Sequence, residues 1–276
     1  MKNSLILLVL LFSIQFSTAQ VKLPAPSPTQ VIKQDFALGS IEITYSRPSA
    51  KGRTIFGGLE SYGVVWRTGA NAATRIKFTE PVELAGKKVD TGTYALYSVP
   101  GIESWEIILN RGVNNWGVDG YKESEDVVRF KIAPTKLKSA VETFTMQFNN
   151  VKPESCDLNI EWDRTSIRIP VTAVIREKIK LQLDAAMRSD SRPYWQAAQF
   201  YNEYEKNPVK ALENITAAVK ENPKAFYMWL YKAKIEQEKG DFKAAMASSQ
   251  TSLALSKEAK NDSYIKMNVE LQKKLK

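Results

Sequence analysis

The sequence has no histidine and only one cysteine, Cys156. The absence of histidine removes the usual general base at neutral pH and every imidazole metal ligand, so a histidine-dependent catalytic triad is excluded within this chain. One cysteine is too few for an internal disulfide or a thiolate zinc site, and Cys156 is predicted to be a buried thiol. These absences favour a protein that is not an enzyme, and neither a cofactor nor a metal site is predicted.

Blocks of like charge are also missing, although 39 Lys and Arg residues against 30 Asp and Glu residues give a formal net charge of +9. Basic and acidic residues are interspersed in stretches such as 176–180 and 232–239, which is typical of solvated helix faces. Tracking of a phosphate backbone requires clustered positive charge. No nucleic-acid partner is therefore expected.

Residues 1–19 have the pattern of a secretory signal peptide. Lys2 precedes an apolar run at residues 5–12, and small residues end the segment at Ala19. The apolar run is shorter than the roughly 20 residues that a membrane span needs, and no later segment is long and apolar enough. We therefore expect an exported, soluble protein, periplasmic or extracellular, with no transmembrane segment.

The next part of the chain has the pattern of an all-β domain. Residues 20–30 carry three prolines and should form an extended entry segment. Over residues 31–172, short runs alternate between apolar and polar side chains, and turn residues separate the runs about every ten positions. This pattern predicts roughly nine or ten antiparallel strands packed as a β-sandwich, with one strand at residues 64–67.

From residue 174 to residue 276, apolar residues recur every three or four positions, which predicts helices. Trp195 and Trp229 are 34 residues apart, as are Ala211 and Ala245, and this period resembles the tetratricopeptide repeat. Two copies and a closing helix would form a stack whose concave face can hold a protein partner. The predicted fold class is therefore α+β by segregation, an all-β antiparallel sandwich followed by an all-α helical-repeat region.

Several motif strings in residues 27–149 carry a further resemblance. They are YSRP at 45–48, KGRTIFG at 51–57, VWRTGAN at 65–71, GTYALY at 92–97, WEIILN at 105–110 and WG at 116–117. The strings resemble a family of exported bacterial proteins known only as domain of unknown function 2911, many members of which carry a similar helical tail. Because the family has no established activity, the resemblance implies an architecture and a compartment but no function.

The candidate site is organised around the turn within residues 63–78, together with neighbouring strings of the same family signature. These segments combine guanidinium groups, amides and indoles, and the predicted ligand-binding residues are Arg47, Arg53, Trp66, Arg67, Asn71, Asn110 and Trp116. Guanidinium groups bind carboxylates in a bidentate manner, and amide side chains both donate and accept hydrogen bonds. If these side chains converge, they would bind an acidic sugar, a glycan or a peptide. The alternative is that both tryptophans lie in the core and the arginines pair internally.

Two other functions stay open at this point. A carbohydrate-active hydrolase would need two carboxyl groups facing each other across a cleft, and acidic residues gather in stretches 119–126 and 154–163. A structural scaffold would act through the helical tail. The sequence favours a third interpretation, a non-catalytic binding or interaction module of the cell envelope with a cationic, aromatic-flanked site on the β-domain.

Overall fold

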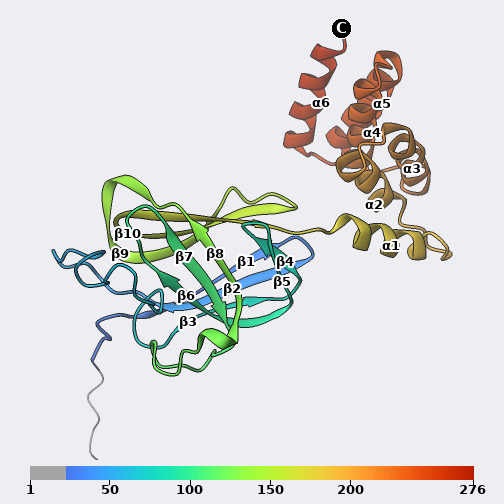
Figure 1. Cartoon of the computed structure of the whole chain (residues 1–276). Helices are drawn as coiled ribbons and strands as arrows, with labels where there is room; N and C mark the ends of the chain where they lie inside the picture. Colours follow the sequence, from blue (N-terminus) through green and yellow to red (C-terminus); the bar gives the residue numbers. More distant parts are fainter. Residues whose placement is uncertain (1–22) are drawn as a thin grey trace, which may run out of the picture. The chain divides into compact units, whose positions relative to one another are not determined.

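The computed structural model describes residues 23–276, and the predicted signal peptide lies outside the described residues. The described chain forms two compact units that divide between Thr172 and Ala173. The first unit contains antiparallel sheets and the second contains helices (Figure 1). The predicted segregation of an all-β part from an all-α part is confirmed. Within residues 23–276, none of the helices has the length and apolar character that crossing a membrane requires.

The β unit consists of two sheets in which all neighbouring strands run antiparallel. The larger sheet has the order β1-β2-β3-β6-β7-β8, with bounds Thr29–Phe36 (β1), Gly39–Ser46 (β2), Thr74–Phe78 (β3), Gly92–Val99 (β6), Trp105–Asn110 (β7) and Asp126–Ile132 (β8). The smaller sheet has the order β5-β4-β10-β9, with bounds Lys87–Val89 (β5), Val82–Leu84 (β4), Ser155–Thr172 (β10) and Thr135–Asn149 (β9).

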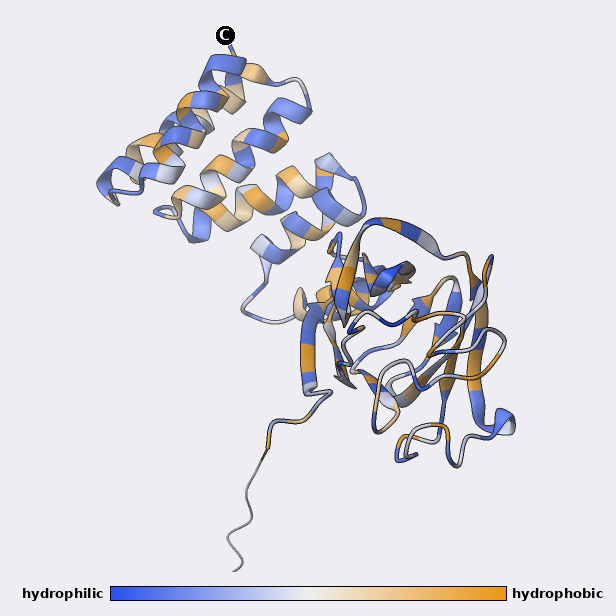
Figure 2. Cartoon of the chain, turned by 90° about the vertical axis from the view of Figure 1, so that its left-hand side faces the viewer, coloured by the Kyte–Doolittle hydropathy of each residue, from blue (hydrophilic) through white to orange (hydrophobic). Residues whose placement is uncertain are grey.

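Side-chain alternation gives each sheet an inner and an outer face. In β3, Thr74, Ile76 and Phe78 are buried, whereas Arg75 and Lys77 are exposed. This follows because successive side chains of a strand point to opposite faces. Figure 2 shows hydrophobic and hydrophilic residues alternating along the strands. The apolar faces of the two sheets pack against each other, as in a β-sandwich.

Aromatic rings fill the space between the sheets. Trp105 comes from β7 in the larger sheet, and Trp162 comes from β10 in the smaller one; both are almost fully buried. Phe56 lies edge-on to both rings, with centroid distances of 4.7 Å and 6.2 Å. Burial of one such indole contributes on the order of 4–6 kcal/mol to folding. Phe56 therefore closes one end of the core with a side chain from a loop.

The predicted strand at residues 64–67 is wrong. Trp66 forms only an isolated antiparallel bridge, with Ser98 of β6. The physical reason is that residues on both sides of the segment, Gly63 (φ +75°) and Thr68 (φ +50°), have left-handed backbone conformations. Such conformations turn the chain out of a ladder, so the pairing is limited to one bridge.

The helical unit contains six α-helices in residues 176–274: Arg176–Ala186 (α1), Tyr194–Gln199 (α2), Pro208–Glu221 (α3), Phe226–Glu238 (α4), Phe242–Glu258 (α5) and Asp262–Lys274 (α6). A π-helical turn, Phe200–Tyr204, extends α2. Three helices begin at polar N-cap residues, because the side chains of Asn207, Asp241 and Asn261 each accept a hydrogen bond from the backbone N–H three residues later. From α2 to α6, each helix packs against the next.

Candidate functional site

The signature turn has a strained backbone whose polar groups bond within the fold. Thr68 is fully buried, and its φ of +50° lies in the left-handed region that β-branched residues rarely adopt. Its hydroxyl lies 2.9 Å from the hydroxyl of Ser98, and its carbonyl accepts a 2.7 Å hydrogen bond from the Thr74 hydroxyl. One residue later, the Gly69 carbonyl accepts a 3.0 Å hydrogen bond from Trp66 Nε1. The turn thus joins the Trp66 indole to strands β3 and β6.

Trp66 belongs to the core. Only 4% of its surface is exposed. Its ring stacks on Trp162, with a centroid distance of 6.0 Å and an interplanar angle of 17°, and meets Phe144 edge-on at 5.3 Å. The geometry supports the core interpretation for this tryptophan, because neighbouring rings occupy the faces that a ligand would use.

Arg47 and Arg53 both donate hydrogen bonds that fix the course of the main chain after β2. Arg47 Nε donates to the Phe144 carbonyl (3.0 Å), and its Nη2 donates to Thr145 Oγ1 (2.8 Å), so the residue after β2 is tied to β9. Arg53 donates two hydrogen bonds, of 3.0 Å and 2.7 Å, to the carbonyls of residues 49–50. Both guanidinium groups therefore donate hydrogen bonds to main-chain carbonyls of the protein itself.

Three of the predicted residues do lie together. Arg67 Nη1 donates a 2.8 Å hydrogen bond to the carbonyl of Asn71. The same guanidinium packs against Gly117, where an added Cβ would lie only 2.5 Å from Nη1. The neighbouring side chain of Trp116 is 65% exposed, so the core interpretation does not hold for this tryptophan. Arg67 thus bonds to the main chain of Asn71 and packs beside the residue that follows Trp116, whereas the Asn71 side-chain amide donates to the Ser27 carbonyl (3.2 Å) and the Ser46 hydroxyl (3.3 Å).

Asn110 is fully buried and positions the loop that carries Trp116. Its amide nitrogen donates to the carbonyl of Lys122 (2.9 Å) and to Asp126 Oδ1 (2.8 Å). Its amide oxygen accepts a hydrogen bond from the Gly112 backbone N–H (2.8 Å). The nitrogen and the oxygen of the amide are therefore both bonded within the protein, and Asn110 joins the two ends of the loop of residues 111–122.

Two acids of the 119–126 stretch, which the hydrolase hypothesis named, converge with Glu106 on one guanidinium. Arg129 lies 2.6 Å from Glu106, 2.8 Å from Asp126 and 3.6 Å from Glu123. The Tyr121 hydroxyl donates to Asp126, and burial together with this carboxylate raises the pKa of Tyr121 to about 12. These acids form an ion-pair network, which differs from two carboxyl groups facing each other across a cleft. Over residues 23–276, no group of three or more His, Cys, Asp and Glu side chains is arranged to hold a metal ion.

The pKa values of Glu60 and Cys156 are both raised well above their ordinary values. Burial raises the pKa of the Glu60 carboxyl to about 7, against the opposing attraction of Arg67 and Arg53. Burial likewise raises the pKa of the Cys156 thiol to about 11, and the thiol is buried as predicted. A thiol with so high a pKa is protonated at neutral pH, so Cys156 is a poor nucleophile.

A pocket lies at the end of the sandwich that Phe56 closes. Its volume is about 230 Å³, and its lining comes from the β2–β3, β6–β7 and β8–β9 connections, from the start of β7, and from β9 and β10. The lining residues are Phe56, Tyr62, Gly101, Ile102, Trp105, Pro134, Thr135, Lys136, Arg164 and Thr165.

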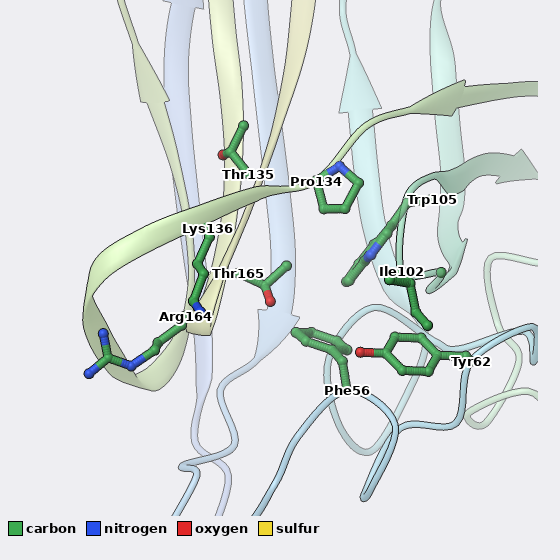
Figure 3. Close-up of a pocket in the computed structure, with 10 residues that line it drawn as sticks. Phe56, Tyr62, Ile102, Trp105, Pro134, Thr135, Lys136, Arg164 and Thr165 are labelled. Atoms are coloured by element: carbon green, nitrogen blue, oxygen red, sulfur yellow. The ribbon is translucent and has the colours of Figure 1, made fainter.

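The pocket has two chemically different walls (Figure 3). Rings and an aliphatic side chain form one wall, which contains Phe56, Tyr62, Ile102 and Trp105. Hydroxyl and cationic side chains form the opposite wall, which contains Thr135, Lys136, Arg164 and Thr165. Figure 3 also shows the Arg164 guanidinium pointing away from the rings, where it donates a 2.7 Å hydrogen bond to the Lys138 carbonyl. Lys136 is thus the nearer charge to the pocket's interior.

A register change between β9 and β10 builds the polar wall. Asp163 pairs with Val141, whereas Thr165 pairs with Lys136, so residues 137–140 of β9 bulge out of the ladder. Bulges bend a strand and redirect side chains, and they are frequent beside functional sites. This bulge brings Lys136 next to Arg164 at the pocket.

One family model matches the chain. Its description is Protein of unknown function (DUF2911), and it matches residues 27–171. The chain belongs to this family. No curated protein and no solved structure matches the chain.

The DUF2911 region ends at residue 171, one residue before β10 ends at Thr172, so the family match spans the sandwich. Inside it, the motif strings supplied only Phe56 and Trp105 of the pocket's side chains. Sequence reasoning missed Tyr62, Lys136 and Arg164, because only long-range pairing brings their segments together. The one local signal is the Pro134 turn followed directly by a threonine and a lysine.

Proposed function

We propose that this DUF2911 protein is a non-catalytic binding module of the cell envelope, and that the pocket between Tyr62 and Lys136 is its ligand site. The observation that carries the proposal is the division of this pocket into a ring-rich wall and a cationic, hydroxyl-bearing wall. Such a division orients a ligand that has an apolar face on one side and a negative charge on the other. The predicted signal peptide supports placement outside the cytoplasm.

The ligand class follows from the size and chemistry of the pocket. At about 230 Å³ it is smaller than the roughly 300–1,000 Å³ typical of sites for larger organic ligands, so it fits one ring or one terminal residue. The Lys136 ammonium supplies a charge-assisted bond to a carboxylate, and the Thr165 hydroxyl can donate or accept. Tyr62 offers a ring with a polar tip. An acidic sugar, the end of an acidic glycan or a peptide C-terminus matches this arrangement.

Thermal denaturation with matched ligands tests the proposal. Galacturonic acid should raise the melting temperature of the chain from residue 20 onward, whereas neutral galactose should not, because ligand binding stabilises the native state by mass action. A peptide ending in a free carboxylate is compared with the same peptide amidated. Lys136→Met should weaken binding of the active acid about 10- to 100-fold through loss of a charge-assisted hydrogen bond.

Lys87→Met is the matched control, because Lys87 is an exposed lysine on β5 that lies outside the pocket. Equal stabilisation by acids and their neutral partners, or equal loss in the two lysine variants, would show that the pocket does not recognise an anion.

A second binding function is supported by the helical unit, for which we propose a tetratricopeptide-like role in holding a protein partner. The 34-residue repeat places Trp195 on α2 and Trp229 on α4, and Ala211 and Ala245 are fully buried on α3 and α5. A cavity of about 300 Å³ lies between α4 and α6, lined by Lys234, Gln237, Glu238, Met267, Glu270, Leu271 and Lys274. Peptide-array binding should be lost in Met267→Asp; binding that survives this change would place the partner elsewhere.

The loop surface formed by Arg67, Asn71 and Trp116 is a third proposed contact region. Support comes from the Arg67 hydrogen bond to the Asn71 carbonyl and from the packing of the Arg67 guanidinium against Gly117, the residue after Trp116. Trp116→Ala, measured with the same acids and peptides, tests it directly. Unchanged affinity in this variant would assign the three residues to the fold alone.

A further inference from the structure

Large apolar side chains are exposed on the loops around the pocket. Ile102 is 76% exposed, Val64 57%, Leu59 44% and Tyr62 43%. The two loops adjoin, because the Gly63 backbone N–H donates a 2.9 Å hydrogen bond to the Pro100 carbonyl, and Tyr62 and Ile102 line the same pocket. We call these four residues the loop-tip patch. Grouped exposed apolar side chains mark an interaction site, whereas scattered ones do not.

The side-chain chemistry of the loop-tip patch favours hydrocarbon over a sugar or a polar protein surface. Three of its members, Leu59, Val64 and Ile102, are aliphatic and offer no ring face on which a sugar could stack. Aliphatic side chains lower their free energy by leaving water for an apolar phase. Tyr62 adds a ring with a hydroxyl tip, a side chain that is enriched where hydrocarbon meets water.

The charges beside the loop-tip patch are mainly positive. Lys136 and Arg164 line the pocket that Tyr62 and Ile102 also line, and Lys138 adjoins them through its bond to Arg164. Two acids lie in the same loops. Burial raises the pKa of Glu60 to about 7, so this carboxyl is half protonated at neutral pH, and Glu103 is the other acid. The formal net charge of the whole chain is +9.

Figure 1 shows the loops of residues 54–62 at one end of the β unit and the end of β10, from which the chain continues to α1, at the other. The patch is therefore formed by loop tips at the end of the sandwich opposite the C-terminal end of β10. Exposed apolar side chains beside cations have the composition that binds an anionic bilayer at its headgroup boundary.

We propose that the loop-tip patch docks on the surface of an anionic phospholipid bilayer. Leu59, Val64 and Ile102 enter the boundary between headgroups and acyl chains, and Lys136 and Arg164 contact lipid phosphates. Long basic side chains can keep their charged ends at that depth while their stems lie against apolar groups. This inference goes beyond the proposed ligand function, because docking requires no ligand in the pocket.

Vesicle co-sedimentation tests the inference with the chain from residue 20 onward, which lacks the predicted apolar leader. The probes are vesicles of phosphatidylcholine alone and vesicles with about one third phosphatidylglycerol. We expect binding to the anionic vesicles that weakens as salt is added, because salt screens charge attraction. Val64→Asp should lower the partition coefficient about tenfold or more. Lys136→Glu should lower it about 30-fold, because the change removes one attractive positive charge and adds one repelled negative charge at the membrane surface.

Matched controls isolate the patch. Val151→Asp changes an exposed valine (45% exposed) in the β9–β10 turn, and Lys87→Glu changes an exposed lysine on β5; both should bind vesicles as the unaltered chain does. Equal effects of Val64→Asp and Val151→Asp, or no vesicle binding at all, overturn the inference.

Galacturonic acid is tested on Val64→Asp in parallel. Binding of the acid without binding of vesicles would refute the membrane-docking inference and leave the ligand proposal intact. Vesicle binding that depends on Val64, together with no response to soluble acids, would do the reverse.

Discussion

Substitution of Gly117 by alanine tests whether the signature arginine Arg67 serves the fold. Gly117 has a φ of +68°, a left-handed conformation that costs an L-residue about 1–2 kcal/mol. An added Cβ would lie 2.5 Å from Arg67 Nη1 and 2.7 Å from Cζ, closer than any stable contact. The guanidinium is the flexible partner, so we expect it to move away and to lose its 2.8 Å hydrogen bond to the Asn71 carbonyl.

The magnitude follows from these two costs. Loss of a hydrogen bond to a charged donor costs about 1.5–3 kcal/mol. Together with the backbone cost of about 1–2 kcal/mol, Gly117→Ala should lower the free energy of unfolding by about 2.5–5 kcal/mol. In an Arg67→Ala background the hydrogen bond is already absent, so the same glycine substitution should cost only the backbone part. The double-mutant cycle should therefore show a coupling of about 2 kcal/mol.

Urea unfolding followed by tryptophan fluorescence measures the cycle. Trp195 and Trp229 are replaced by phenylalanine in all four proteins, because the four remaining tryptophans then lie in the β unit. A coupling near zero would refute the reasoning, since it would mean that Arg67 and Gly117 stabilise the fold independently. The control is Gly86→Ala, another glycine with positive φ (+78°), whose Cβ would meet no atom within 4 Å; it should show the backbone cost and no coupling to Arg67.

Three further predictions concern the same unit and use the same urea assay. Trp66→Ala should cost about 3–5 kcal/mol because the ring is in the core, whereas Trp116→Ala should change stability by less than about 0.5 kcal/mol; similar costs would contradict their placement. Because the pKa of Glu60 is raised from 4.5 to about 7, the native state holds this proton more tightly, and stability should fall by about 2 kcal/mol as pH rises from 4.5 to 7. Glu60→Gln should abolish this fall in stability with pH. If the pH profile of stability is the same in Glu60→Gln, the fall does not come from Glu60. Arg129→Met should cost about 2–3 kcal/mol by leaving carboxylates unpaired, and a neutral outcome would show that water replaces the guanidinium.

The strands were predictable where one face of a sheet is buried and the other is solvated. Ile41, Ile43 and Tyr45 alternate with polar residues, and all three are buried in β2. Ala85-Gly86 joins Leu84 directly to Lys87, and both residues have positive φ, as in a type I′ turn; the glycine between two short apolar runs is the local sequence signal for it. Such features depend on a few neighbouring residues and on a period of two.

The candidate site was less predictable because residue type does not reveal where a side chain bonds. Arg47 and Arg53 have the chemistry of anion ligands, but main-chain carbonyls accept their hydrogen bonds. Asn110 likewise has both amide donors bonded beneath a loop. The pocket depends on the bulge at residues 137–140, which follows from the pairing of β9 with β10 and leaves no periodic trace in the sequence.

The outer edge of β9 has a consequence for how copies of this chain meet. Between residues 142 and 146, the backbone groups that face away from β10 are occupied: the Ala50 N–H bonds to the Glu142 carbonyl, Arg47 to the Phe144 carbonyl, and the Tyr45 hydroxyl to both backbone groups of Met146. An open edge of this kind is a template on which another strand can add, and proteins protect such edges against aggregation. Arg47 and Tyr45 therefore occupy backbone groups of this edge strand to which a strand of another copy of the chain could otherwise bond.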